Sequence, residues 1–225
     1  MTAIKSLLLL GPPGAGKSPL SQYLGRQLLS GRRFLSFDFG QELRHILETW
    51  SEQTVPTGRL NGLQISYDSQ EIERICQTVE KGILFEESDR ELTRKILTNF
   101  LNKNSPSATD ILVLNGLPRH EGQVAWLEGL TRIVLAVNLD CPEDISIRRI
   151  LANLDGDRTS RADDRPEMIS HRYHLYEERT KPLLSFLTKQ GIPVIALTVN
   201  ETIRPELLWQ KLFLNEAFNR NLING

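Results

Sequence analysis

Eight residues near the start of the chain have the types and spacing to hold a polyphosphate. Residues 11–18 read GPPGAGKS and match the pattern GxxxxGK[ST]. Glycines in such a loop let successive backbone amides turn toward phosphate oxygens, and the helix that follows adds its positive dipole end. The lysine would supply a cation for the terminal phosphates, and the serine a hydroxyl for Mg²⁺. The predicted ATP-binding residues are Gly11, Pro13, Gly14, Ala15, Gly16, Lys17 and Ser18.

One proline follows this loop at a position where a backbone amide would be useful. Pro19 suits the first turn of a helix, yet it has no N–H to donate to the α-phosphate. A hydrogen bond to a charged group contributes about 1.5–3 kcal/mol. We therefore expect weaker ATP binding than in a loop with an N–H there, and we expect Pro19→Thr to change the ATP dissociation constant.

Apolar runs that predict strands alternate with helical patterns. The runs occupy residues 4–10, 34–37, 111–114, 133–139 and 193–199. Helical patterns occupy residues 20–29, 42–50, 71–80, 90–101, 123–130, 142–151, 165–188 and 205–218. This alternation predicts an α/β fold: a P-loop, three-layer α/β/α domain with a five-stranded parallel sheet. Ligands of such sheets bind beyond the carboxyl ends of the strands.

Two segments interrupt the alternation and predict lids over that edge of the sheet. Residues 40–82 are predicted to form a helical insertion, and residues 51–68 within it to form an exposed polar loop. Between residues 40 and 101 we expect only helices and loop. Residues 150–164 form a short, charged lid. We expect a single domain over residues 1–225, with 40–82 on the acceptor side.

Composition excludes several classes of function. The chain has 225 residues, with 27 basic and 28 acidic side chains. It therefore lacks the basic excess that would indicate a nucleic-acid partner. The two cysteines have no metal-ligand spacing. His171 and His174 lie one turn apart without further ligands and read as surface residues. No signal peptide and no apolar stretch of about 20 residues is present, so a cytoplasmic protein without membrane contact is expected.

Further motifs give the chain a family resemblance. Residues 115–119 read NGLPR and precede Gln123, which resembles the DGFPR…Q of the adenylate kinase and UMP/CMP kinase family. Residues 161–164 read RADD and precede Arg172, Tyr176, Thr180 and Pro182, as in R-x-D-D…R…Y…T-x-P. Phe39, Gly40, Leu43 and Arg44 resemble the family's TGD-x-LR. With the phosphate loop, the similarity covers residues 4 to about 205.

The resemblance implies a nucleoside monophosphate kinase that uses ATP and Mg²⁺, without zinc because the short lid has no cysteines. Its partners would be ATP and a nucleoside monophosphate, and it would be a monomer. Arginine suits this chemistry because its charged fork matches phosphate oxygens. Ser18 and, through water, Asn115 would hold the metal, and the backbone at Ile203 would contact adenine. The implied catalytic residues are Lys17, Arg119, Arg149, Arg161 and Arg172. The implied acceptor-site residues are Phe39, Gly40, Arg44, Gly116, Arg119 and Gln123, with Gln123 at the base edge.

Several positions depart from the family pattern and leave alternatives open. Asn115 replaces an aspartate, which should lower metal affinity, and Phe39 replaces a threonine near the acceptor base. The second lid arginine would fall at Asn153, with Arg158 as a possible substitute, and Arg148 competes with Arg149 for the site. Asp164 and Glu167 have the spacing of a helix capping box, so Asp164 could have this structural role instead of a catalytic one.

These departures leave three functions in play, and none of the motifs names the acceptor base. The first is an active kinase with altered acceptor choice. The second is a catalytically weak or inactive nucleotide-binding regulatory protein that retains the fold. The third is another small-molecule P-loop kinase.

Overall fold

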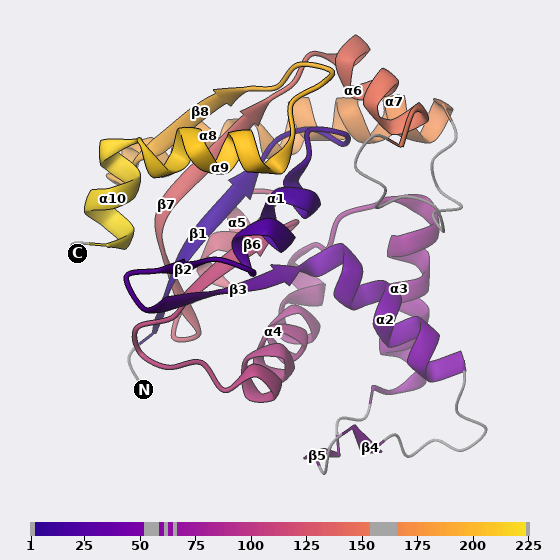
Figure 1. Cartoon of the computed structure of the whole chain (residues 1–225). Helices are drawn as coiled ribbons and strands as arrows, with labels where there is room; N and C mark the ends of the chain where they lie inside the picture. The colour runs from indigo at the N-terminus through magenta and orange to yellow at the C-terminus, as the bar shows by residue number, and fades with distance from the viewer. Residues whose placement is uncertain (1–2, 52–58, 61–62, 65–66, 154–165, 224–225) are drawn as a thin grey trace.

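A curled six-stranded sheet forms the centre of the molecule (Figure 1). The structure is a computed structural model that describes residues 3–51, 59–60, 63–64, 67–153 and 166–223. The strand order is β2-β3-β6-β1-β7-β8. Five strands pair in parallel, as predicted, and β2 adds an antiparallel edge. The strands are β1 (Ile4–Leu10), β2 (Leu28–Leu29), β3 (Arg32–Asp38), β6 (Ile111–Asn115), β7 (Thr131–Asp140) and β8 (Val194–Thr198).

Helices cover both faces of this sheet because its inner strands are apolar on both sides. Leu7 and Leu9 of β1 pack into one core cluster, with side chains of α1 (Lys17–Leu24), α9 (Pro205–Phe213) and α10 (Glu216–Leu222). Leu8 and Leu10 pack into a second cluster on the opposite face, with α4 (Arg90–Asn104) and α8 (Pro182–Lys189). In Figure 1, α1 and α9 lie in front of the sheet. The predicted three-layer α/β/α architecture is therefore confirmed. None of the described helices is both long and apolar enough to cross a bilayer.

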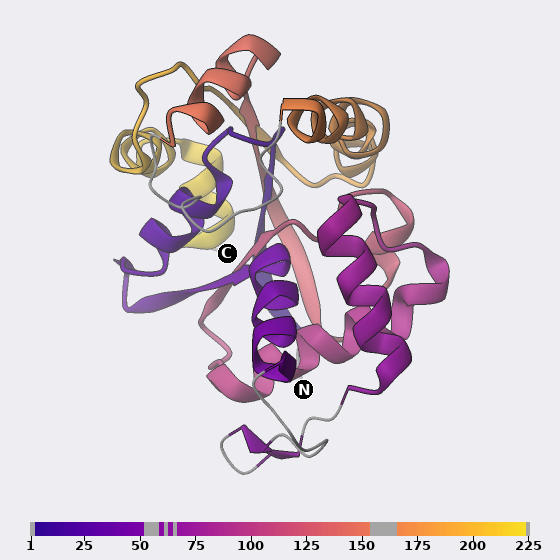
Figure 2. The same cartoon turned by 90° about the vertical axis from the view of Figure 1, so that its right-hand side faces the viewer.

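The insertion after β3 consists of two neighbouring helices and a small strand pair. In both views, α2 (Phe39–Ser51) and α3 (Ser69–Lys81) lie side by side (Figures 1 and 2). Helix α3 starts at a capping box between Asp68 and Glu71, and it ends at Gly82, which has a φ of 66°. Between the helices, β4 (Arg59–Leu60) and β5 (Leu63–Gln64) pair antiparallel. The expectation of helices and loop alone was therefore wrong, since the periodic signal of a two-residue strand is too short to read.

Several predicted helices are shorter than expected, each for a local reason. The helix expected over 20–29 ends at Leu24, and the chain continues as a β2–β3 hairpin whose turn residues Ser30 and Gly31 both have positive φ. The pattern at 123–130 yields only α5 (Gly122–Ala125). The pattern at 205–218 divides at Asn215, whose side chain accepts hydrogen bonds from the first amides of α10.

The long helix predicted over 165–188 is also interrupted. It consists of α7 (Pro166–Leu175), a π-helical turn (Tyr176–Thr180) and α8. The 3-10 turn η1 (Glu87–Asp89) leads into α4, and α6 (Glu143–Leu151) follows β7.

The strand register brings polar residues together at one edge. Asp38, the last residue of β3, pairs with Asn115, the last residue of β6. Asn115 also pairs with Leu9 of β1, just before the glycine-rich loop. Because parallel strands end at the same edge, the loop and both polar side chains meet there.

Candidate active site: a cationic cavity at the end of the sheet

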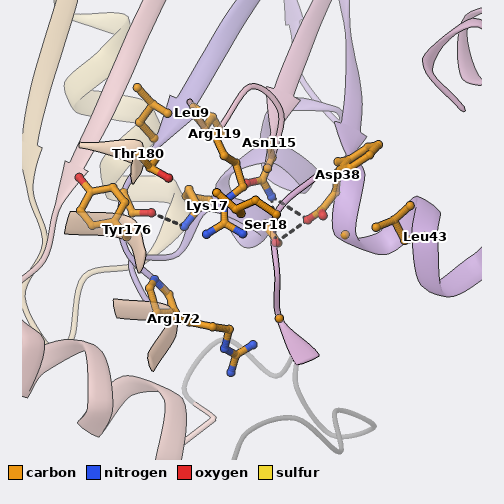
Figure 3. A pocket seen from close by; sticks show the side chains of 18 of the residues that line it. Leu9, Lys17, Ser18, Asp38, Leu43, Asn115, Arg119, Arg172, Tyr176 and Thr180 are labelled. Carbon is orange, nitrogen blue, oxygen red and sulfur yellow. Dashed lines mark hydrogen bonds between the residues drawn. The ribbon is translucent and has the colours of Figure 1, made fainter. Parts of the chain in front are cut away.

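A cavity of about 220 Å³ opens at this edge (Figure 3). Its walls come from the end of β1 and the following loop, the β3–α2 junction, the end of α3, the segment after β6, and α7 with its π-helical turn. Predicted site residues that line the cavity are Gly11, Pro13, Gly14, Gly16, Lys17, Ser18, Phe39, Gly40, Arg44, Asn115, Gly116, Arg119, Gln123 and Arg172. Four sequence blocks thus converge on one space.

The loop over residues 11–18 has a backbone conformation that its glycines permit. Gly14 and Gly16 have φ values of 77° and 88°, and a Cβ atom on Gly14 would lie 2.6 Å from the carbonyl oxygen of Ser146. Helix α6 supports the loop, because the Ser146 hydroxyl donates a hydrogen bond to the carbonyl of Pro13. Helix α1 begins at Lys17, and amides in the first turn of a helix have no acceptors within the helix. The loop therefore presents donors to an anion.

Lys17 curls back over the loop. Its ammonium donates hydrogen bonds to the carbonyl oxygens of Gly11 at 2.6 Å and of Pro12 at 2.7 Å. A phosphate in the cavity would offer charged oxygens in place of these neutral carbonyls, and charged acceptors form the stronger bonds. The lysine is thus held close to where the terminal phosphates would lie.

Ser18, Asp38 and Asn115 form a hydrogen-bonded group beside the loop, and in Figure 3 the latter two point toward Ser18. The Ser18 hydroxyl donates to Oδ2 of Asp38 at 2.5 Å. The Asn115 amide nitrogen donates to Asp38 Oδ2 at 2.7 Å and to Ser18 Oγ at 3.0 Å. The backbone amide of Gln41 donates to Asp38 Oδ1 at 3.1 Å.

Asp38 is the site residue that the sequence analysis missed. Its position in the sequence could have revealed it, because Asp38 follows the apolar run 34–37 directly and so ends a predicted parallel strand. The expectation for Asn115 also needs correction. A carboxylate accepts hydrogen bonds only, so the amide must turn its NH₂ group toward Asp38 and Ser18. The NH₂ end, rather than the oxygen expected to order metal-bound water, faces the group.

Three arginines add charge to the cavity. Burial, with the nearby charge of Arg172, lowers the pKa of Arg119 to about 10, so its guanidinium remains protonated at neutral pH. Arg172 packs its side-chain stem over Gly82 at the end of α3, with Cγ 3.5 Å from where a Cβ atom would stand. The Arg44 guanidinium passes close to Gly40. The chain therefore places cations from three separate helices or loops around one space.

Gln123 lines the cavity and also holds two backbone segments in place. Its side-chain oxygen accepts the backbone amide of Arg119 at 2.7 Å, and its nitrogen donates to the carbonyl of Phe85 at 2.9 Å. The side chain is 2% exposed. His120 contacts the same carbonyl of Phe85 at 3.1 Å. With one hydrogen bond at each end of its amide, Gln123 positions Arg119 and the segment at Phe85.

Arg149 lies outside the cavity, contrary to expectation. The residue is 3% exposed, and its guanidinium donates to four backbone carbonyls, of Gly14 at 2.8 Å and of Asn200, Glu201 and Ile203 at 3.0–3.1 Å. The side chain therefore connects the phosphate loop to the segment after β8. Neither Ile203, which is buried in the core, nor Ala15 lines the cavity.

The remaining predicted residues divide into two groups. Phe39 is 6% exposed and packs edge-on against Phe85, with ring centroids 5.3 Å apart, so it forms the apolar floor of the cavity near the insertion. Arg161, Arg158 and Asp164 lie outside the described residues. Asn153, at the end of α6, has a φ of 44° and does not line the cavity.

The charge of the cavity is opposite to that of the chain. Its described lining contains one carboxylate, Asp38, and four cationic side chains, Lys17, Arg44, Arg119 and Arg172. The chain as a whole has a formal net charge of −1. Low-dielectric walls strengthen such a local field. The cavity therefore suits a ligand with several negative charges.

The parallel sheet, the glycine-rich loop before α1 and the cationic cavity define a P-loop nucleotide-binding protein. A family model described as an AAA domain matches residues 7–173, and the chain belongs to that family. It is 27% identical to an adenylate kinase of Prochlorococcus marinus, over 81% of this chain and 84% of the relative. It is 28% identical to an adenylate kinase of Thermus thermophilus, over 84% and 86%, and 26% identical to one of Thermobifida fusca, over 83% and 86%. Within the family it is thus an adenylate kinase-like phosphotransferase.

The donors beside the loop fit a hard divalent cation. Mg²⁺ prefers oxygen ligands, commonly one or two carboxylates with phosphates and water. The Ser18 hydroxyl and the Asp38 carboxylate meet that preference at the start of α1. Among the residues that the structure describes, no three His, Cys, Asp or Glu side chains gather into a metal-binding group.

Proposed function

We propose that the protein transfers the γ-phosphoryl group of ATP to a nucleoside monophosphate, giving ADP and a nucleoside diphosphate. The observation that carries the proposal is the cavity with four cations and one carboxylate, which adjoins the glycine-rich loop. The similarity to adenylate kinases over more than four-fifths of the chain supports the same acceptor class.

The phosphate loop would bind the donor. Amides at the start of α1 and the Lys17 ammonium would contact the β- and γ-phosphates, after Lys17 leaves the carbonyls of Gly11 and Pro12. Ser18 and Asp38 would hold Mg²⁺, which supplies charge neutralisation at the transferring phosphates when bound. Arg149 and Ser146 would keep the loop in place from behind.

The acceptor would enter on the α2–α3 side. Arg44 comes from α2 and Arg119 from the segment after β6, and together they could hold the phosphate of the acceptor. Gln123 would fix the backbone of Arg119 through its 2.7 Å hydrogen bond. The apolar floor at Phe39 and Phe85 would receive the nucleoside. Selection of the base would then depend on the shape of this floor and on the neighbouring Gln123 and α3.

Transfer would need positioning and charge stabilisation more than covalent help. The attacking oxygen of the monophosphate is already ionised, so no general base is required. Arg119 and Arg172 would stabilise the charge that spreads over the group in transit, and arginines in that role accelerate phosphoryl transfer by about 10³–10⁵. Closure of the insertion and of the lid over 150–164 would exclude water and prevent ATP hydrolysis.

A monophosphate panel tests the proposal. Purified protein is given ATP, Mg²⁺ and AMP, CMP, UMP, GMP or dAMP, and ADP formation is followed by a coupled assay. We expect turnover with at least one monophosphate, and its loss in Lys17→Ala. ATP binding without turnover above the Lys17→Ala level, for every monophosphate, would instead indicate a regulatory nucleotide-binding protein.

A further inference from the structure

Asp38 has the position and contacts of a metal-binding carboxylate. It is the only acidic side chain among the described residues that line the cavity. Oδ2 accepts hydrogen bonds from Ser18 and Asn115, and Oδ1 accepts the amide of Gln41. An ionised carboxylate has about four lone-pair sites. These three donors fix its orientation and leave acceptor capacity for a further ligand.

The hydrogen-bond count at Ser18 supports the same role. A hydroxyl has one proton and two lone pairs. The proton of Ser18 goes to Asp38, and one lone pair accepts a proton from Asn115. One lone pair remains, and it belongs to an oxygen 2.5 Å from a carboxylate oxygen. By this count Ser18 Oγ and Asp38 Oδ1 each keep one acceptor site, in side chains whose orientation is fixed by the hydrogen bond between them and by the Gln41 amide.

Asn115 is excluded as the metal-binding member of the group. Its NH₂ has two protons, and these are directed at Asp38 Oδ2 and Ser18 Oγ. A donor group turned toward the site repels a cation. Asn115 is 3% exposed and is the register partner of Asp38 on the neighbouring strand.

We propose that Asp38, together with Ser18, holds the Mg²⁺ of Mg·ATP, directly or through water, and that Asn115 is a positioning residue that fixes this pair. The inference rests on the proposed function, because it takes Mg·ATP as the donor. It differs from the assignment that the family resemblance suggests, which places the metal contact at position 115. In this chain the carboxylate is Asp38 on β3, the register partner of Asn115 on β6.

The test compares nucleotide affinity with and without the metal. The dissociation constant of a non-hydrolysable ATP analogue, AMP-PNP, is measured by calorimetry in excess Mg²⁺ and again in EDTA. The dissociation constant in EDTA divided by that in Mg²⁺ gives a ratio that reports how much the bound metal strengthens nucleotide binding. Outer-shell and ligand changes at metal sites commonly cost 10–100-fold in metal affinity. We expect Asp38→Asn to lower the ratio by about 10-fold or more, and to leave binding in EDTA unchanged or tighter, since a negative charge is lost.

Two further variants separate the metal from the fold. Asp140 ends β7 at the same edge of the sheet, is exposed and does not line the cavity. Asp140→Asn is the matched control and should leave the ratio unchanged. The exchange Asp38→Asn with Asn115→Asp keeps one carboxylate and one amide in the same register pair. It should restore most of the ratio that Asp38→Asn loses, which a merely structural role would not predict.

Each outcome bears on the proposal. An unchanged ratio in Asp38→Asn overturns it, and so does equal weakening in Mg²⁺ and in EDTA, which would show that Asp38 only supports the loop. Thermal melts confirm that each variant is folded. The measurement needs no acceptor, so a failure to phosphorylate monophosphates leaves this test intact and the two proposals remain distinguishable.

Discussion

Replacing Arg149 should destabilise the protein and loosen the phosphate loop, because the residue supports the loop and is not a catalytic group. Arg149 is 3% exposed, and its guanidinium donates to the carbonyl of Gly14 and to three carbonyls over residues 200–203. Arg149→Met keeps a long stem and removes every donor. The four carbonyls then lose this partner at the junction between the loop and the segment after β8.

The size of the effect follows from the number of protons. Nε has one proton, and Nη1 has two protons shared among three carbonyls, so about three effective bonds are lost. A hydrogen bond to a charged group contributes about 1.5–3 kcal/mol, but losses at one side chain are not additive. We expect the free energy of unfolding to fall by about 3–5 kcal/mol, together with weaker AMP-PNP binding.

The neighbouring arginine supplies the control. Arg148 makes ion pairs with Asp144 at 2.8 Å and with Glu201 at 3.1 Å, and all three side chains are about half exposed. Exposed pairs contribute about 0–1 kcal/mol. Urea unfolding of Arg149→Met, Arg148→Met and the native chain measures the difference. If Arg149→Met unfolds like the native chain and binds AMP-PNP normally, yet loses turnover, the residue acts in catalysis and the positioning argument is refuted.

Three other predictions concern the site and its surroundings. Arg119→Ala should lower turnover by at least about 10² with AMP-PNP affinity nearly unchanged, because a contact made in the transition state is lost; normal turnover would remove Arg119 from the reaction. Burial raises the Asp89 pKa, but hydrogen bonds from Arg74 and from the Glu86 amide outweigh burial and leave the pKa below its ordinary value. Its stabilisation is then present above about pH 4 and is lost as pH falls through the lower, folded pKa. Asp89→Asn should therefore cost about 1–3 kcal/mol at pH 7 in urea unfolding and less in acid, and an equal cost at both pH values would contradict this. Burial raises the pKa of Cys141 to about 11, so this thiol should resist Ellman's reagent at pH 8 until the protein is denatured, and rapid labelling of the folded chain would refute the burial.

The sequence predicted the elements whose signals are long or chemically dense. The loop over 11–18 and the apolar runs of the five parallel strands could be read directly, and the inner strands most clearly, since a strand buried on both faces is continuously apolar. Those elements also predicted where Lys17, Ser18 and Arg119 would meet, because strand ends in a parallel sheet share an edge, whereas Arg172 on α7 was expected there from the family resemblance alone.

The missed features depend on which way a side chain points. Arg148 and Arg149 are adjacent and chemically identical, and only the packing of α6 against the phosphate loop shows which is buried. Asn115 looked like a weak metal contact until its partner Asp38 determined the direction of its amide. The β2–β3 hairpin was missed for a different reason: its first strand, Leu28–Leu29, has only two residues and gives no periodic signal.

If the cavity binds ATP and a nucleoside monophosphate together, the γ-phosphate passes from the first nucleotide to the second. The protein is incubated with [γ-³²P]ATP, Mg²⁺ and the best monophosphate of the panel, and the products are separated by thin-layer chromatography. We expect the label in the nucleoside diphosphate, with little as inorganic phosphate, and we expect Lys17→Ala to abolish this transfer. Label released only as inorganic phosphate, or retained in ATP although ATP binds, would contradict it.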